Sequence, residues 1–521
     1  LTYIKALVGY SNLPNAELYN NITYKEIPDG PNLSMRDEQL SIEEIFTATY
    51  DSLFSDFIMP SINKIKKKAN KLVLTVPNTY TPRHMEYIRR IVGKTLPDIR
   101  QDYTWFLSES DAIACYYTNK WNTLNADRQN KDMIRKNIEN ILIFDMGAGT
   151  LDITYFSIDS TIVDRKKIEI KAKIGLNKAG NYLDYILAKT LVNVDPAFSE
   201  IFFTPDAKAA LKDRAHRAKQ FIRNELKPHL FTDDTIHFNA WETYKANNED
   251  FSNRPIDLSK IRSSALVTGF IKEVTHDLID NFFKINGYLE GATPIDTIVF
   301  AGRSTLFGGT EPDGIKMNVM NSLRKWNGNS NLYDISLHDN DLKTVVSEGA
   351  LYFATLYSND ATTIKIYNRN IYASYGVIYT KIDGTTGYCK LLSPNTQAIV
   401  EPNMLESNTK DGVYIYQYDT DIYNASGERN TKSELNLRNS ATAYFVQSYS
   451  DDTVRDWDEG RKDFITEMFQ FNTQQVVTRD EDREKVPVRI VVNEDGEMEF
   501  YAGNLHNEPG APLRIDVTYS D

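Results

Sequence analysis

The sequence reads Asp145-Met146-Gly147-Ala148-Gly149-Thr150-Leu151-Asp152 directly after an apolar stretch, 140–144, that predicts a buried strand. Glycines at this position let backbone amides approach an anion closely. Thr150 adds a hydroxyl, and Asp145 and Asp152 are suited to hold water around a magnesium ion. A tight hairpin that merely needs glycine would use the same residues. Taken alone, the eight residues leave both interpretations open.

Patterns on either side of this turn predict a mixed α/β fold. Short apolar strands are expected at 71–76, 103–107 and 297–300, with a hairpin continuing from the turn to residue 174. Helical spacing dominates 179–289, apart from a strand near 235–238, and a helix starting at 41 is expected to kink at Pro60. Strands that alternate with crossing helices indicate an α/β class.

After residue 357 the pattern changes to strict alternation, which predicts an all-β region. Residues 488–492 and 497–501 flank Asn493-Glu494-Asp495-Gly496, a sequence typical of a hairpin turn. Further strands are expected at 413–418, 444–449 and 513–519, whereas the acidic stretch 451–463 is interpreted as a solvated loop.

Composition excludes several classes of function. The net charge of −13 argues against nucleic acid as the main partner, because phosphate binding relies on clustered Lys and Arg. Two cysteines are too few for a disulfide framework or a cysteine-based zinc site, and they fit a reducing compartment. No apolar run is long enough to cross a bilayer, and no signal peptide is recognised. We therefore expect a cytoplasmic protein without a membrane partner.

Residues 145–152 closely resemble the second phosphate loop of the DnaK-type (seventy-kilodalton heat-shock) chaperones, which belong to the actin and sugar-kinase superfamily. Other segments resemble that family in the same order along the chain. They are 72–77, 107–114, 175–184, 217–219, 298–305 and 347–350. Together these matches are much more specific than any one of them.

The resemblance implies an actin-like (ribonuclease H-like) two-lobed ATPase domain followed by an all-β, sandwich-like domain. Residues 1–137 would form lobe I, incomplete at its N-terminus, and 138–342 would form lobe II with a helical insertion at about 185–290. A closing helix, 343–360, would return to lobe I, and 361–521 would form the substrate-binding domain.

The resemblance also implies a site for ATP or ADP with Mg²⁺. Asp145, Asp152, Glu109 and Thr150 would be catalytic, and Asp145 and Glu109 would hold the metal through water. The nucleotide-binding residues would be Gly147, Ala148, Gly149, Thr150, Gly180, Lys219, Gln220, Gly302, Arg303 and Ser304.

Several positions depart from the family pattern. His216 replaces a ribose-binding Glu, Gln220 and Leu306 replace arginines that contact adenine, and Arg303 replaces a glycine of the adenosine loop. These changes put adenine specificity in question. Nothing in 1–140 resembles the family's first phosphate loop, which we infer to lie upstream of Leu1, and Lys25 is only a weak candidate for its catalytic lysine.

The leading hypothesis is a chaperone-like ATPase whose C-terminal β domain holds an extended peptide or protein client. A co-chaperone or nucleotide-exchange protein would be a further partner. Whether ATP is hydrolysed to ADP and phosphate stays open at this stage. The alternatives are a nucleotide-binding scaffold that does not hydrolyse ATP, and an actin-like filament former or small-molecule kinase.

Overall fold

The computed structural model describes a set of separate ranges of the chain. They are 72–80, 104–125, 138–162, 165–198, 220–238, 254–328, 331–337, 341–356, 364–368, 373–381, 384–392, 432–436, 442–460, 464–472, 485–492 and 498–502, with the short pieces 245–246, 249–250, 409–410 and 413–414 and the positions 52, 60, 85, 88, 89, 92 and 93. The expected strand at 513–519, most of the helix starting at 41, Lys25, and Arg217 to Lys219 lie outside these ranges. In the described ranges no helix is both long and apolar enough to span a bilayer.

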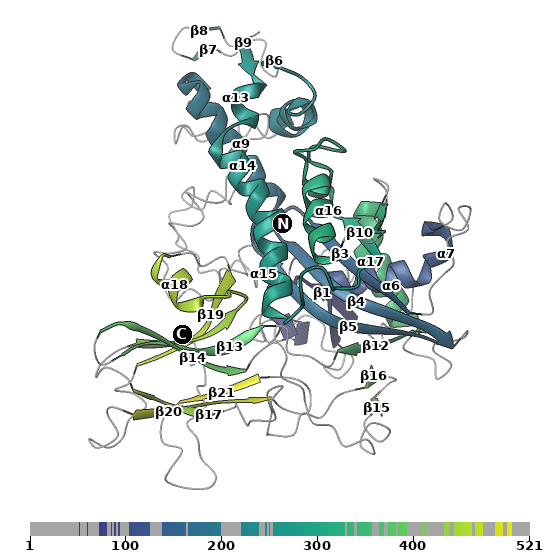
Figure 1. Ribbon diagram of the computed structural model, residues 1–521, viewed down its shortest axis with the longest axis vertical. Coiled ribbons are helices and arrows are strands. Elements are labelled where there is room, and N and C mark those ends of the chain that lie inside the picture. The colour runs from purple at the N-terminus through teal and green to yellow at the C-terminus, as the bar shows by residue number, and fades with distance from the viewer. Residues whose placement is uncertain are drawn as a thin grey trace.

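A mixed six-stranded sheet forms the centre of the molecule (Figure 1). Its strand order is β11-β10-β3-β4-β5-β12. The strands are β3 (Ile138–Met146), β4 (Leu151–Ile162), β5 (Arg165–Leu176), β10 (Thr297–Ala301), β11 (Tyr333–Ser336) and β12 (Ile364–Asn368). β3, β4 and β5 are antiparallel neighbours, whereas β10 runs parallel to β3, β11 parallel to β10, and β12 parallel to β5.

The predicted α/β class is therefore confirmed, together with the strands at 140–144 and 297–300 and the hairpin after the glycine-rich turn. The predicted all-β region also contributes a strand to the central sheet. β12 lies inside the range 361–521 but pairs with β5 of the central sheet. The pairing of an edge strand depends on backbone hydrogen bonds, which leave no mark on the sequence.

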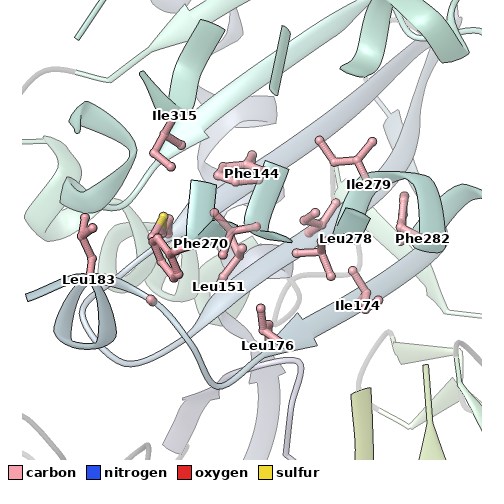
Figure 2. Close-up of a cluster of buried hydrophobic side chains, with 14 of the residues drawn as sticks. Phe144, Leu151, Ile174, Leu176, Leu183, Phe270, Leu278, Ile279, Phe282 and Ile315 are labelled. Carbon is pink, nitrogen blue, oxygen red and sulfur yellow. The ribbon is translucent and has the colours of Figure 1, made fainter. Parts of the chain in front are cut away.

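Helices cover both faces of the sheet because apolar side chains alternate along each strand. Leu142 and Phe144 of β3 pack in the cluster formed with α9 (Gly180–Val194), α14 (Ala265–Lys272), α15 (Leu278–Ile285) and α16 (Ile315–Trp326). Figure 2 shows part of this core, where Phe144 and Ile174 lie among Leu183, Phe270, Phe282 and Ile315.

On the opposite face, Ile141 and Ile143 pack with α6 (Glu109–Asn119) and α17 (Asp341–Leu356). The two helices cross in backbone contact. A Cβ atom added to Gly349 of α17 would lie 1.8 Å from the Ala112 carbonyl oxygen of α6. Only glycine allows this approach. The helix predicted around 347–350 is thus present and packs on α6.

A small parallel pair stands beside α6 and α17. It consists of β1 (Leu72–Val76) and β2 (Thr104–Ser108), as predicted, and Pro77 follows the end of β1. β2 runs directly into α6, whose first turn is capped by the Ser108 side chain. A short helix, α7 (Trp121–Leu124), comes next.

The expected helical insertion contains more strand than predicted. α9 and α14 extend from the sheet toward a hairpin at the top of Figure 1. That hairpin pairs β6 (Thr235–Phe238), as expected, with β9 (Arg254–Asp257). The remaining pieces are the 3₁₀ helix Pro196–Phe198, the π-helices Ile222–Leu226 and Glu273–Asp277, α12 (Lys227–His229), α13 (Leu258–Arg262), and the bridges β7 (Lys245–Ala246) and β8 (Glu249–Asp250).

The C-terminal part contains two antiparallel sheets. A four-stranded sheet is ordered β14-β13-β18-β19, and a three-stranded sheet is ordered β17-β20-β21. Their strands are β13 (Ser374–Thr380), β14 (Thr386–Leu392), β18 (Thr442–Ser448), β19 (Ile465–Asn472), β17 (Lys432–Asn436), β20 (Lys485–Val492) and β21 (Met498–Ala502), with a separate pair β15 (Thr409–Lys410) and β16 (Val413–Tyr414). Phe500 contacts Phe445 and Phe469 and so joins the two sheets.

The predicted hairpin around Asn493 to Gly496 is confirmed, because Val492 pairs with Met498. The interpretation of 451–463 as loop was wrong, since α18 (Thr453–Asp458) lies within it. Asp452 caps this helix by accepting from the Arg455 amide, and Trp457 packs on Tyr444. An acidic sequence thus forms a helix because it supplies its own cap and one aromatic anchor.

Candidate functional site

The carboxyl ends of several parallel strands come together at one edge of the central sheet. β3 ends at Met146 and its parallel neighbour β10 at Ala301, where the chain turns through Gly302. β1 and β2 end at Val76 and Ser108, and the residues that follow them contact β4 and β5. Ligands of α/β proteins commonly bind beyond the carboxyl ends of parallel strands. This edge is therefore the candidate site.

The glycine-rich turn is fixed by its carbonyl groups. Within the turn, the Gly147 amide donates to the Thr150 carbonyl at 3.0 Å. The Gly147 carbonyl accepts from the Gly180 amide at 3.1 Å and from the Ser304 hydroxyl at 2.9 Å. The Ala148 carbonyl accepts from the Asn181 amide at 2.7 Å. The first turn of α9 lacks a side-chain cap, so the turn's carbonyls satisfy its amides instead.

This arrangement determines where the next amides point. In a trans peptide the N–H lies antiparallel to the preceding carbonyl, and the described part of the chain contains no cis peptide. The amides of Ala148 and Gly149 therefore point away from α9. Across the described ranges neither amide donates to a protein acceptor, and Ala148 is exposed at the tip of the turn. Neighbouring outward amides of this kind form an anion-binding concavity.

Two further predicted glycines lie against this turn. A Cβ atom on Gly180 would lie 2.1 Å from the Ser304 hydroxyl oxygen. Gly302 has φ +75°, and a Cβ there would lie 2.3 Å from the Met146 carbonyl oxygen. The structure thus brings Gly180, Gly302 and Ser304 to the turn. Arg303 and Gln220 lie within the described ranges and are exposed to solvent, whereas Lys219 lies outside these ranges.

Asp145 and Asp152 are direct cross-strand neighbours on β3 and β4. Both are buried, at 7% and 1% exposure, and both point to the α6 side, because Ile143 of the same strand face packs with α6. The Asp145 carboxylate lies against the backbone of Gly302. The Asp152 carboxylate accepts from the Asn78 backbone amide at 2.8 Å, so it links the segment after β1 to β4 of the central sheet.

The first turn of α6 carries Glu109 into this polar region. Glu109 is buried, and its neighbour Ser110 donates to the Asn78 side chain at 3.0 Å. The Thr154 hydroxyl of β4 donates to the Ser110 hydroxyl at 2.6 Å, and the side-chain nitrogen of Asn78 donates to the Thr154 hydroxyl. Sequence reasoning missed Asn78, Ser110 and Thr154, because single polar residues far apart in the chain show no pattern.

Lys173 of β5 adds a positive charge to the same face. Its ammonium donates to the Asp111 carboxylate at 2.5 Å and to the Ser108 hydroxyl at 3.2 Å. Both members of the ion pair are more than nine-tenths buried. Asp111 belongs to the first turn of α6, so this pair also ties α6 to the central sheet.

A second cationic group lies on the α9 side of the turn. Arg223 donates to the Asp184 carboxylate at 3.1 Å and to the Asn181 side chain at 3.4 Å. Lys227 also pairs with Asp184. The backbone amide of Asn181 donates to the Ala148 carbonyl of the turn. Asn181 therefore connects the half-exposed Arg223 guanidinium to the turn. No sequence signal marked it.

The C-terminal sheets reach this region through Tyr449, which follows β18. The Asn281 side chain of α15 donates to the Tyr449 carbonyl. Burial raises the pKa of the Tyr449 phenol, as do the nearby Tyr375 and the negative charge of Asp152.

These observations define a mixed α/β protein with an amide-lined turn and buried carboxylates at the strand ends. Among the described residues, no group of three or more His, Cys, Asp or Glu side chains could hold a metal directly. No protein-family model matches the chain, and no curated protein matches it at a significant level.

Proposed function

We propose that the chain is an ATP-binding protein of the actin-like class, and that it uses ATP hydrolysis to control a client bound by its C-terminal sheets. The strand arrangement supports the fold. β3, β4 and β5 form an antiparallel meander, and β10 and β11 continue in parallel beside β3, as expected for a ribonuclease H-like lobe. α6 and α17, which cross beneath the sheet, would connect this lobe to lobe I.

The observation that carries the proposal is the fixed orientation of the turn. Its carbonyls are bound by Gly180, Asn181 and Ser304, so its outward amides are preorganised before any ligand arrives. Preorganised donors stabilise developing charge because they need no rearrangement during the reaction. A polyphosphate with its magnesium ion fits such donors beside the buried carboxylates of Asp145 and Asp152.

Within this proposal, the outward amides of Ala148 and Gly149, together with Thr150, bind the β- and γ-phosphates, and Gly147 shapes the turn through the hydrogen bond from its amide to the Thr150 carbonyl. Asp145 and Glu109 hold Mg²⁺ through water, and the metal neutralises phosphate charge. Asp152 acts mainly by holding Asn78, as its hydrogen bond indicates. The nucleoside lies on the side of Gly180, Gly302 and Ser304, where Arg303, Gln220 and Arg223 offer donors.

The C-terminal sheets are proposed as a sandwich that binds an extended peptide by strand addition. The contacts of Phe500 with Phe445 and Phe469 support the sandwich. Tyr449 supports coupling, because its carbonyl accepts a hydrogen bond from the Asn281 side chain of α15. Closure around a nucleotide would then be transmitted at this contact.

Isothermal titration calorimetry of the full chain with ATP, with and without Mg²⁺, tests the proposal. We expect saturable binding that strengthens when Mg²⁺ is present, and phosphate release measured on the same sample. Absence of binding at millimolar ATP would overturn the nucleotide site. Binding without phosphate release would favour the non-hydrolysing scaffold, and nucleotide-dependent light scattering would favour a filament.

A further inference from the structure

The ion pair between Lys173 and Asp111 joins two parts of the chain at the candidate site. Lys173 lies near the C-terminal end of β5, opposite Thr154 of β4. Asp111 lies in the first turn of α6, and the side chains are 9% and 6% exposed. A charged pair removed from water so completely requires good geometry, and here the Ser108 hydroxyl is a second acceptor for the ammonium.

The ion pair contacts the cap and the first turn of α6, and these residues set the direction of the helix. Ser108 caps the helix by accepting from the Asp111 amide at 3.1 Å, and the same hydroxyl accepts from Lys173. Glu109 lies between Ser108 and Asp111 in the chain. Any movement of Lys173 would therefore shift the cap, the first helical turn and the Glu109 carboxylate together.

We infer that Lys173 is a positioning residue: through Asp111 and Ser108 it holds Glu109 at the strand ends that carry Asp145. The inference rests on the proposed function, because it assigns Glu109 to the water shell of the magnesium ion. Lys173 itself touches neither nucleotide nor metal. It also neutralises Asp111, so that Asp111 does not compete with Glu109 for the cation.

A purely structural role is the competing explanation, and the crossing of α6 and α17 argues against it. The Gly349–Ala112 contact and the Ser110–Asn78 hydrogen bond already attach α6 to its surroundings. Replacing a buried ion pair by apolar residues of similar size commonly preserves a fold. The Lys173–Asp111 pair is therefore not needed to attach α6 to the sheet. It is needed to place the Glu109 carboxylate to within a fraction of an ångström.

The test uses the full chain with Lys173→Met and Asp111→Leu combined, and with Lys173→Arg alone. The double variant should melt near the parent and, without Mg²⁺, bind ATP with a Kd within about threefold of the parent, because the amides of the turn are untouched. Turnover should fall by about tenfold or more, and the Mg²⁺ concentration for half-maximal turnover should rise severalfold. The single variant Lys173→Arg, which keeps the positive charge, should retain most of the parental turnover.

Lys316→Met with Asp334→Leu is the matched control, since it removes an ion pair that joins α16 to β11. It should leave the Mg²⁺ dependence unchanged. A folded Lys173/Asp111 double variant with parental turnover and Mg²⁺ dependence would overturn the inference while leaving the nucleotide site intact. If turnover and ATP binding fell together with the melting temperature, the pair would be structural. If the parent bound no ATP, the proposed function would fail first and the inference with it.

Discussion

The Asn78 amide lies 2.8 Å from a carboxylate oxygen of Asp152, although 74 residues separate them in the chain. The Asn78 side chain also donates to the carbonyls of Ile153 and Ile174. The residue therefore fastens the end of β1 to the β4–β5 hairpin through both its backbone and its side chain.

Asn78→Ala should lower the free energy of unfolding by about 1–3 kcal/mol, because it leaves half-buried carbonyl groups without their donor. The backbone bond to Asp152 would remain. Chemical denaturation measures the change. Asn321→Ala, at an exposed position of α16, is the control and should stay within about 0.5 kcal/mol of the parent. An equally small effect at Asn78 would show that water replaces its side chain.

Asp145→Asn combined with Thr150→Ala should lower ATP turnover by about tenfold or more while the fold is kept, the scale for losing groups that stabilise transferring charge. Phosphate release measures turnover, and circular dichroism checks the fold. The control changes the same residue types at the far end of the hairpin, Asp159→Asn with Thr161→Ala. Parental turnover in the Asp145/Thr150 variant would remove both residues from the mechanism.

Gly180→Ala should destabilise the protein by about 1–3 kcal/mol, because the new methyl group would overlap the Ser304 hydroxyl oxygen. Ser304→Ala removes that oxygen and the hydrogen bond to the Gly147 carbonyl. The double variant should therefore be more stable than the sum of the single effects, with a coupling of about 0.5–3 kcal/mol in a double-mutant cycle. Strict additivity would mean that the two loops do not touch in solution.

Gly349→Ala should destabilise the protein by more than about 1 kcal/mol, since its Cβ would lie 1.8 Å from the Ala112 carbonyl oxygen and the helices would have to separate. Gly269→Ala is a matched control inside another helix, α14, where a Cβ meets nothing within 4 Å. That change should stabilise by up to about 1 kcal/mol through helix propensity. Thermal melting of both variants gives the comparison, and effects of the same sign would contradict the helix crossing.

Alkaline pH should unfold the protein. Burial, followed by the charge of Glu169, raises the pKa of Tyr288 to about 12, and burial likewise raises the pKa values of Tyr155 and Tyr449. An unfolded tyrosine ionises near pH 10, so roughly above that value the unfolded state binds fewer protons than the folded state. The stability contributed by these phenols is complete below about pH 10 and is lost as the pH rises through about 12.

Phenolate absorbance and circular dichroism, followed in one alkaline titration, measure this loss. A group of buried tyrosines should ionise together with the disappearance of secondary structure, after the exposed ones have titrated. Ionisation of all 31 tyrosines near pH 10 with secondary structure intact would contradict the burial of these side chains.

Local sequence was sufficient for most of the described elements. Strands such as β3 and β10 are runs of buried apolar residues, and the β20–β21 hairpin shows alternation on both sides of a turn sequence. The glycine positions were also informative. Gly180 and Gly302 were marked by the family resemblance, and in the structure glycine alone tolerates the backbone or side chain pressed against its α-carbon there.

The sequence by itself therefore determined elements such as β3, β10 and the β20–β21 hairpin, because these depend on neighbours within a few residues. Only the tertiary structure decided that Asn78 meets Asp152, that Lys173 pairs with Asp111, that Arg223 reaches Asn181 and that β12 joins β5. A lone Asn, Lys or Arg has no periodicity, and an edge strand pairs through backbone groups that every residue carries. Such contacts become specific only when packing has brought the partners within hydrogen-bond distance.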